Sequence, residues 1–395
     1  MRSYAAGRVL AITVASALLF WLAVALLQKF NWELGVYKAL VLTVLLAAVP
    51  FVAWRAGEPA AAPVPRLLKA AVMILLLLQV GYAVTKLRHP SLIDAANITV
   101  AEGRGLLAGS NPYQSALDTE AEAATHAARF AGYKYLPVTI AAYLPLGGPL
   151  GPRGIVLTNL LLELAVVALI FRLCAALSVP SAGWLAALLY LSLPMVPFQL
   201  FAKGALDLAA VIPLLAAFVL IERKPALAGL CVGLSLVAKL LPGALLLPCM
   251  VPARPRNRWA YTAGVAVGLL PVLPFAFWSP AALFDNIIVF NLVRPADSTN
   301  WLLAVPGARP AATAAMVLLY VAAALDIWLR PPALARRVGI AVALILASLI
   351  AAPAAHHNYN LWWLPLGCAL LGAALAPRRL PSAAAAATKA PLGSI

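Results

Sequence analysis

Charged residues are scarce in this chain of 395 residues, making up only 11% of it. A soluble domain has about 25% charged and roughly 45–50% apolar residues, whereas 64% of this sequence is hydrophobic. The mean hydropathy is +0.95. This balance excludes a soluble globular protein and predicts an all-α polytopic membrane protein.

Acidic residues are the scarcer sign of charge: 13 Asp and Glu stand against 29 Lys and Arg, which gives a net charge of +16. Such an excess is also found in nucleic-acid-binding proteins. Here the basic residues form short clusters between apolar runs, which is the positive-inside pattern of membrane proteins and argues against nucleic acid. The clusters are Arg2 and Arg8; Arg55, Arg66 and Lys69; Arg254, Arg256 and Arg258; Arg330, Arg336 and Arg337; Arg378 and Arg379.

Cysteine is rare as well, with four residues and no CxxC spacing. All four lie within apolar runs, so we interpret them as packing residues and expect neither disulfides nor a zinc site. The residues alone therefore establish no cofactor; they leave a divalent metal open without supporting one. The four are Cys174, Cys231, Cys249 and Cys368.

Apolar runs of about 20 residues are abundant, and each is long enough for one transmembrane helix. They predict about twelve spans (11–13), with both termini cytoplasmic and the first span retained rather than cleaved as a signal peptide. The expected spans are 9–27, 36–54, 67–85, 135–149, 154–173, 181–200, 205–221, 226–250, 259–278, 310–329, 338–355 and 359–377.

These spans divide the chain into two N-terminal helices (1–66), a main membrane domain (67–377) and a disordered cytoplasmic tail (378–395). Long external loops are expected at about 86–134 and 279–309, and loops of such length are usually functional or disordered. The middle of the chain stays ambiguous. Lys203 and the basic cluster after Glu222 cannot both be cytoplasmic if 205–221 is one span, and 226–250 is either broken or a hairpin.

Asp94 stands out at the head of the first long loop, because a carboxylate at a membrane surface has no packing reason to be there. The pattern over 93–108 predicts a short helix on the membrane that ends at Gly109. At roughly 100° per residue, Asp94, Asn97 and Arg104 share one polar edge of that helix. The alternative is an ordinary interfacial helix with a solvated face.

Several further polar residues stand beside or within apolar runs, and each has an alternative structural interpretation. Lys134, between Tyr133 and Tyr135, contacts a ligand or belongs to an aromatic belt with a snorkelling lysine. Lys203 and Asp207 bind substrate or pair with each other one helical turn apart. Glu163 and Lys239 lie inside apolar runs; Lys239 needs a partner, which is Glu163, a ligand phosphate or the membrane interface.

Two adjacent histidines, His356 and His357, precede the last span together with Tyr359. They point in different directions on a helix and are poor joint metal ligands, but one of them can donate a hydrogen bond to an anion. The alternative is a polar cap on the last helix. Arg294, in the second long loop, is a weaker candidate for anion binding.

This set of residues matches the needs of sugar transfer from a lipid phosphate. The leaving phosphate needs cations or hydrogen-bond donors but no proton donor. The acceptor hydroxyl needs one base, so a single carboxylate suffices for an inverting displacement, and the lipid tail needs an apolar groove.

Short motifs in matching order extend this interpretation over about 67–377. The chain reads Asp94, a helix, then Gly109-Ser110-Asn111-Pro112-Tyr113; later come Tyr133 to Pro137, Lys239 to Pro242, and His356 to Tyr359. This order resembles that of the GT-C superfamily of integral-membrane glycosyltransferases, and most closely the bacterial polyprenyl-phosphate-mannose-dependent mannosyltransferases. The resemblance implies a GT-C type helix arrangement in a bacterial plasma membrane, with an extracytoplasmic active site.

The resemblance also implies roles for particular residues. Asp94 would be the general base, and His356 or His357 would contact the donor phosphate. We expect Lys203, Lys239 and Arg294 to assist in phosphate binding. Some relatives bind a divalent ion, although this chain offers no metal cluster. The expected substrate-binding residues are Asn97, Arg104, Tyr113, Tyr133, Lys134, Tyr135, Asp207 and Tyr359.

The chain departs from the family pattern in two places. Gly204-Ala205 stands where the family often has Gly-Gln, and the first two spans are an addition without an assigned role. The resemblance implies a polyprenyl-phosphate-linked sugar as donor and a lipid or glycan as acceptor. Two rival hypotheses remain: a lipid or small-molecule transporter with a charged site at the membrane midplane, and a scaffold subunit in which Asp94 has no chemical role.

Overall fold

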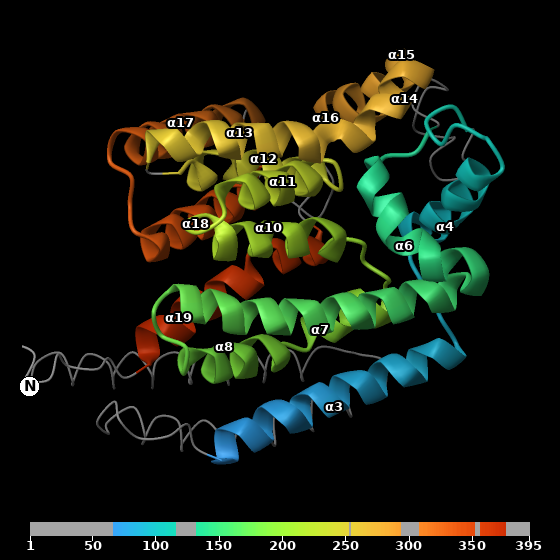
Figure 1. Ribbon diagram of the computed structural model, residues 1–395. Helices are drawn as coiled ribbons and strands as arrows, with labels where there is room; N and C mark the ends of the chain where they lie inside the picture. The colour runs from blue at the N-terminus through green and yellow to red at the C-terminus, as the bar shows by residue number, and fades with distance from the viewer. Residues whose placement is uncertain (1–65, 116–131, 253, 294–307, 352–355, 377–395) are drawn as a thin grey trace, which may run out of the picture.

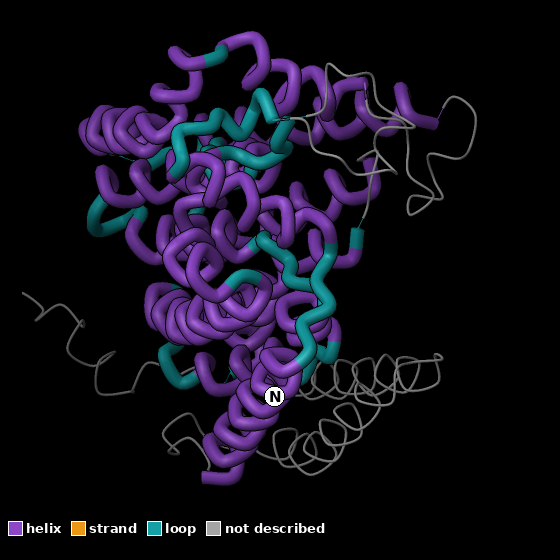
Figure 2. The backbone as a smooth tube through the Cα atoms, turned by 90° about the vertical axis from the view of Figure 1, so that its right-hand side faces the viewer, coloured by secondary structure: helices purple, strands orange, loops and turns teal. Residues whose placement is uncertain are grey.

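The computed structural model describes residues 66–115, 132–252, 254–293, 308–351 and 356–376. Every regular element in these residues is a helix, and no strand occurs among them (Figure 2). The predicted all-α class is therefore confirmed for this part of the chain. The expected spans 9–27 and 36–54 and the expected tail 378–395 lie outside the described residues.

Four helices in the described residues are long and apolar enough to cross a membrane. A fifth is obtained if α8 (Ala182–Leu191) and the pair α9 (Met195–Pro197) and η2 (Phe198–Ala202), bent by 59°, count as one span. The four are α3 (Arg66–Arg88), α7 (Pro152–Ala176), the run Pro255–Trp278 made of α13 (Pro255–Leu269), η4 (Leu270–Val272) and α14 (Leu273–Trp278), and Pro310–Leu329 within α17 (Ala308–Leu329).

The predicted count of about twelve spans is not confirmed, because many apolar runs are broken into helices too short to cross a bilayer, which takes about 20 residues. Proline starts or interrupts many of them, since it lacks the N–H that continues a helix. The remaining described helices are α4 (Asp94–Leu107), α6 (Pro137–Leu150), α10 (Leu208–Leu220), α11 (Pro225–Leu236), α12 (Leu240–Leu246), η3 (Pro248–Met250), α15 (Pro280–Phe284), η5 (Asp285–Val289), α16 (Phe290–Val293), α18 (Leu334–Ala351), η7 (His357–Trp362) and α19 (Leu364–Leu375).

The two long loops differ from their predictions in part. In the first, helix α4 is found within one residue of the predicted 93–108, and Gly109 follows it with a φ of 87°. The second was expected to be a loop from residue 279, but its first part is helical: α15, η5 and α16 follow each other from Pro280 to Val293. This stretch is apolar, so it can pack where a polar loop cannot.

Basic clusters gather at one end of the molecule. The start of α3, the α10–α11 connection, the start of α13 and the α17–α18 connection all lie at the left in Figure 1. The end of α3, α4 and α6 lie at the opposite end. Lys203 follows η2 on that opposite side, because α10 runs between Lys203 and Glu222. Lys203 and Glu222 therefore lie at opposite ends of the molecule.

The expected span 226–250 is broken between α11 and α12. Residues at the start of α6 bind the break: the backbone N–H of Val138 donates to Val237 O at 3.0 Å, and the Thr139 hydroxyl donates to Ala238 O at 2.8 Å. These bonds satisfy carbonyls that the interrupted helix leaves open. The break thereby holds Lys239, the next residue, in a fixed place.

Candidate functional site

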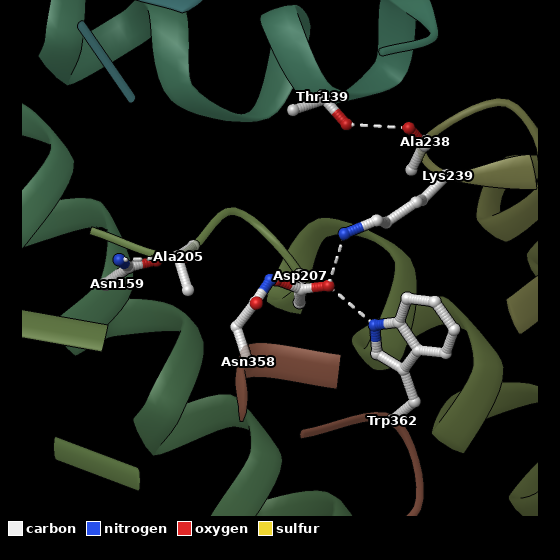
Figure 3. A network of polar contacts seen from close by, with 8 residues as sticks. All are labelled: Thr139, Asn159, Ala205, Asp207, Ala238, Lys239, Asn358 and Trp362. Atoms are coloured by element: carbon white, nitrogen blue, oxygen red, sulfur yellow. Dashed lines mark hydrogen bonds and ion pairs between the residues drawn. The ribbon is translucent and has the colours of Figure 1, made fainter. Parts of the chain in front are cut away.

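A buried carboxylate, Asp207, lies where three separate segments of the chain meet (Figure 3). Its Oδ1 accepts hydrogen bonds from Lys239 Nζ at 2.6 Å and from the indole Nε1 of Trp362 at 2.5 Å. Its Oδ2 accepts one from Asn358 Nδ2 at 2.7 Å. Asp207 is 1% exposed, so its charge is compensated inside the protein rather than by water.

The chain before Asp207 is held in a tight turn. Gly204 has a φ of 70°, a region that glycine adopts without strain. Asn159 of α7 donates from Nδ2 to Leu200 O at 2.7 Å and to Ala205 O at 3.1 Å. The turn therefore delivers Asp207 to the start of α10, facing the α11–α12 break.

Three aromatic rings surround the ammonium group of Lys239; we refer to Tyr135, Tyr359 and Trp362 as the aromatic box. Lys239 Nζ lies 4.5 Å from the ring centroid of Tyr359, 5.1 Å from that of Trp362 and 5.4 Å from that of Tyr135. Tyr359 and Trp362 are stacked with centroids 4.6 Å apart. Ring faces attract cations, so the box stabilises the lysine charge together with Asp207.

A cavity of about 350 Å³ adjoins the aromatic box. One part of its wall carries Lys134, Lys239 and the three rings of the box. The rest is predominantly apolar, so the cavity offers a cationic and aromatic wall beside a greasy one. The apolar lining comes from Leu240, Leu241, Leu245, Ile287, Phe290, Met316 and Val317.

Lys134 is fixed at this cavity by a buried asparagine. Its Nζ donates to Asn286 Oδ1 at 2.8 Å and to Gly132 O at 2.6 Å, and lies 4.8 Å from the ring centroid of Phe290. Asn286, 1% exposed, in turn donates from Nδ2 to Tyr113 O at 3.2 Å. Asn286, from the second long loop (279–309), thus positions Lys134, which belongs to the first (86–134).

Asp94 begins α4 and is exposed. Among the described residues, no group binds its carboxylate and it does not line the cavity. The preceding residue ties the helix start to the Asp207 turn, because the backbone N–H of Ile93 donates to Lys203 O at 2.9 Å. Ala95 packs against the same hydrophobic cluster as Tyr135 of the aromatic box. Asp94 is therefore a carboxylate that lies beside the segments that build the site and is unpaired within the described ranges.

The predicted polar edge of α4 is present, since Asn97 and Arg104 are exposed as Asp94 is. Arg104 has a structural partner: its Nε and Nη2 donate to Gly148 O at 2.9 and 2.7 Å, near the end of α6. A cation that binds the last carbonyls of a helix stabilises that end. The structure does not bring Arg104 or Asn97 to the cavity.

Two of the predicted substrate-binding tyrosines are buried in packed structure instead of lining the cavity. Tyr113, 2% exposed, donates its hydroxyl to Tyr135 O at 2.9 Å. The Tyr133 hydroxyl lies 2.9 Å from that of Thr99. Burial raises the pKa of both phenols, so they stay neutral. Their places also differ from an exposed aromatic belt.

The predicted pairing of Lys203 with Asp207 is wrong. Lys203 is exposed, with Nζ 5.5 Å from the ring centroid of Phe198, while Asp207 binds Lys239. Glu163 as partner of Lys239 is wrong as well, because Glu163 is buried on α7 and accepts a hydrogen bond from Tyr190 at 2.9 Å. The turn at Gly204 rotates Asp207 away from Lys203 and toward the helix break.

The histidine segment joins the site through its second half. His356 directly precedes η7, and its ring meets that of Tyr359 edge-on with centroids 5.4 Å apart. Its side chain makes no capping hydrogen bond, which removes support from the helix-cap interpretation. The side chain of His357 and the whole of Arg294 lie outside the described residues.

Sequence reasoning missed three residues that organise the site: Trp362, Asn358 and Asn286. Asn286 and Trp362 are polar groups beside apolar residues, and Asn358 lies in the polar segment that holds the two histidines, so these signals were available. The sequence did not show which residues they would bind, because partners such as Trp362 and Asp207 are separated by 155 residues along the chain.

The described residues contain no group of three or more His, Cys, Asp or Glu side chains placed to hold a metal ion. Comparison of the chain with protein-family models, with curated proteins and with solved structures found no match.

Proposed function

We propose that this protein is an inverting glycosyltransferase that moves a sugar from a polyprenyl-phosphate donor to a lipid-linked or glycan acceptor on the extracytoplasmic face. Mannose is the sugar that the family resemblance implies. The observation that carries the proposal is the cavity beside Asp207. It combines an apolar wall for an isoprenoid tail with Lys134 and Lys239 for a phosphate, on the wall that also carries the aromatic box.

The chemistry assigns separate tasks to the two ends of the site. The cations hold the donor phosphate and stabilise the negative charge that develops on it as the bond to the sugar breaks. Asp94 accepts the proton of the acceptor hydroxyl as its oxygen attacks the anomeric carbon from the opposite face. The sugar is transferred with inversion, and the lipid leaves as a phosphomonoester.

Two observations support a role for Asp94 in this reaction, although Asp94 does not line the cavity. The Ile93–Lys203 bond holds the start of α4 against the turn that leads to Asp207. An exposed carboxylate without a partner in the described residues is also free to accept a proton, whereas Asp207 is occupied by three donors.

The test is sugar transfer from a labelled polyprenyl-phosphate sugar in membranes that contain each variant. Asp94→Asn should leave the protein folded and lower turnover roughly 10²- to 10⁴-fold, the usual contribution of a general base. Asp326→Asn is the matched control, because Asp326 pairs with Arg336 in a surface ion pair at the end with the basic clusters. Turnover of Asp94→Asn at the wild-type rate removes Asp94 from the mechanism, and no transfer by the wild type with any such donor rejects the proposal.

One observation favours the second candidate, a lipid or small-molecule transporter. The Asp207–Lys239 ion pair lies at a break between two apolar helices, a place where transporters hold their substrates. The two functions differ in their measurable products. A transferase forms a new glycoside without net translocation, and a transporter moves labelled lipid between leaflets of a vesicle without changing it.

A further inference from the structure

Asp207 accepts more hydrogen bonds than the neutralisation of one lysine requires. Lys239 and Trp362 share Oδ1, and Asn358 binds Oδ2. If Lys239 moves away, two neutral donors still bind the buried carboxylate. A buried charge that loses all its partners is strongly unfavourable, and this cost normally keeps a buried ion pair together. For Asp207 the cost is reduced, because Trp362 and Asn358 still bind the carboxylate.

Lys239 is the member of the ion pair that has room to move. Its side chain is 15% exposed against 1% for Asp207, and it lines the cavity, whereas Asp207 does not. All three rings of the aromatic box also line the cavity. An ammonium group that turns from Asp207 toward the cavity stays near ring faces, which stabilise a cation along the way.

We propose that Asp207 is a positioning residue that holds Lys239 at the cavity wall, and that the ammonium group passes from Asp207 to the phosphate of a lipid when that lipid binds. Asp207 then competes with the phosphate for one cation and recovers it when the product leaves. The exchange deepens the proposed function and rests on it, because it takes a phosphate as the ligand headgroup.

The experiment uses the full chain purified in detergent micelles and three probes. Citronellyl phosphate supplies an isoprenoid tail and a phosphate, citronellol the tail alone, and inorganic phosphate the charge alone. Calorimetry gives the dissociation constants. Labelling with 5-fluorotryptophan reports on Trp362, whose ¹⁹F resonance is identified by its loss in Trp362→Phe.

In the wild type, citronellyl phosphate should shift the Trp362 resonance further than citronellol does, because only the phosphate draws the lysine away from the indole face and the shared Oδ1. Lys239→Met should abolish this difference and weaken citronellyl phosphate binding at least about tenfold, the value of a hydrogen bond to a charged group. Binding of citronellol should be unchanged in Lys239→Met.

Asp207→Asn distinguishes a positioning role from a purely structural one, because the two roles predict opposite changes in the affinity for citronellyl phosphate. Removing the competing charge should tighten citronellyl phosphate binding by roughly threefold to tenfold. A purely structural Asp207 would instead weaken the binding of both citronellyl phosphate and citronellol. Asp326→Asn, which breaks an ion pair elsewhere in the chain, should change neither constant. Thermal melting checks that each variant is folded, and the Trp362 shift in the wild type tests the exchange should Asp207→Asn not fold.

The outcomes separate the exchange from the proposed function. Tight binding of citronellyl phosphate with a Trp362 shift no larger than that caused by citronellol overturns the exchange and leaves the donor site in place. No binding of citronellyl phosphate by the wild type overturns both. Inorganic phosphate that binds as tightly as citronellyl phosphate shows that the tail contributes nothing, and this rejects a lipid as the ligand.

Discussion

The hydroxyl groups of Tyr133 and Thr99 lie 2.9 Å apart and join α4, which begins at Asp94, to the segment that brings Lys134 and Tyr135 to the cavity. Thr99 donates its own proton to Ala95 O at 2.7 Å, so Tyr133 is the donor between the two side chains. This assignment gives the two partners unequal roles. Within the described part of the chain, Thr99 is the only acceptor for the Tyr133 hydroxyl, whereas Thr99 keeps its bond to Ala95 O without Tyr133.

Thr99→Val should therefore be more destabilising than Tyr133→Phe. The valine leaves a buried phenol without an acceptor and should cost about 1–3 kcal/mol in the free energy of unfolding, against about 1 kcal/mol for the phenylalanine. The double variant should lose less than the sum. Unfolding in detergent measures the three values.

Tyr261→Phe provides the control for these two substitutions. The Tyr261 hydroxyl is buried and has no hydrogen-bond partner among the residues that the structure describes, so its removal should leave stability unchanged or slightly raised. Equal losses in Thr99→Val and Tyr133→Phe would contradict the assignment of Tyr133 as donor.

Glu102 gives the fold a dependence on pH. It lies on the buried side of α4, and burial raises the pKa of its carboxyl above the ordinary value of 4.5, while the hydrogen bond from Ser115 at 2.7 Å lowers it in part. Folded Glu102 thus keeps its proton to a higher pH than unfolded Glu102. Stability should fall as pH rises from the ordinary value through the raised one, and level off above it.

The melting temperature of the wild type and of Glu102→Gln, measured from pH 4 upward, checks this sign. The glutamine cannot ionise, so its curve should lack this fall. Ser115→Ala removes the bond that lowers the pKa of Glu102 and should extend the fall to higher pH. A wild-type curve that rises over the same window, relative to Glu102→Gln, would show that the buried carboxylate is stabilised in its charged form.

Helix α4 and the long apolar helices were predictable because their signals are local. The helix α4 ends where a glycine allows a positive φ, and α3 and α7 are unbroken apolar runs. The Asp207–Lys239 pair was not predictable in the same way. Asp207 has Lys203 within one helical turn, and only the turn at Gly204 and the break before Lys239 decide the partner.

The glycines of α11 and α13 illustrate a second limit of sequence reasoning. Gly229 and Gly233, spaced by four residues, face Gly264 and Gly268 with the same spacing. A Cβ added at Gly233 would lie 2.7 Å from the Gly268 Cα, and one at Gly268 would lie 2.5 Å from Leu230 O. Small residues at this spacing let two helices approach closely in a membrane. Each motif is visible in the sequence, but their mutual contact is not.

Gly233→Ala and Gly268→Ala should each destabilise the protein by about 1–3 kcal/mol, because the new methyl group meets backbone atoms that cannot move aside. Gly81→Ala is the matched control: Gly81 lies in α3, and an added Cβ there meets nothing within 4 Å. That change should be neutral or slightly stabilising, since alanine favours the helix. Melting curves in detergent compare the three, and an undisturbed Gly268→Ala would refute the close contact.

Substitution of Arg104 can distinguish a structural role from the substrate-binding role predicted from the sequence. Its two hydrogen bonds to Gly148 O close the end of α6 at an exposed site, so Arg104→Gln should lower stability by about 0.5–1.5 kcal/mol. A structural role leaves KM for the sugar donor unchanged once the variant is folded at low temperature. A substrate role raises KM without a comparable loss in melting temperature.

Arg153→Gln, which changes another exposed arginine at the start of α7, controls for the loss of one positive charge at this end. Arg104 binds the end of α6 and does not line the cavity, so we expect Arg104→Gln to act through stability. A raised KM at full stability would show that Arg104 contacts the sugar donor.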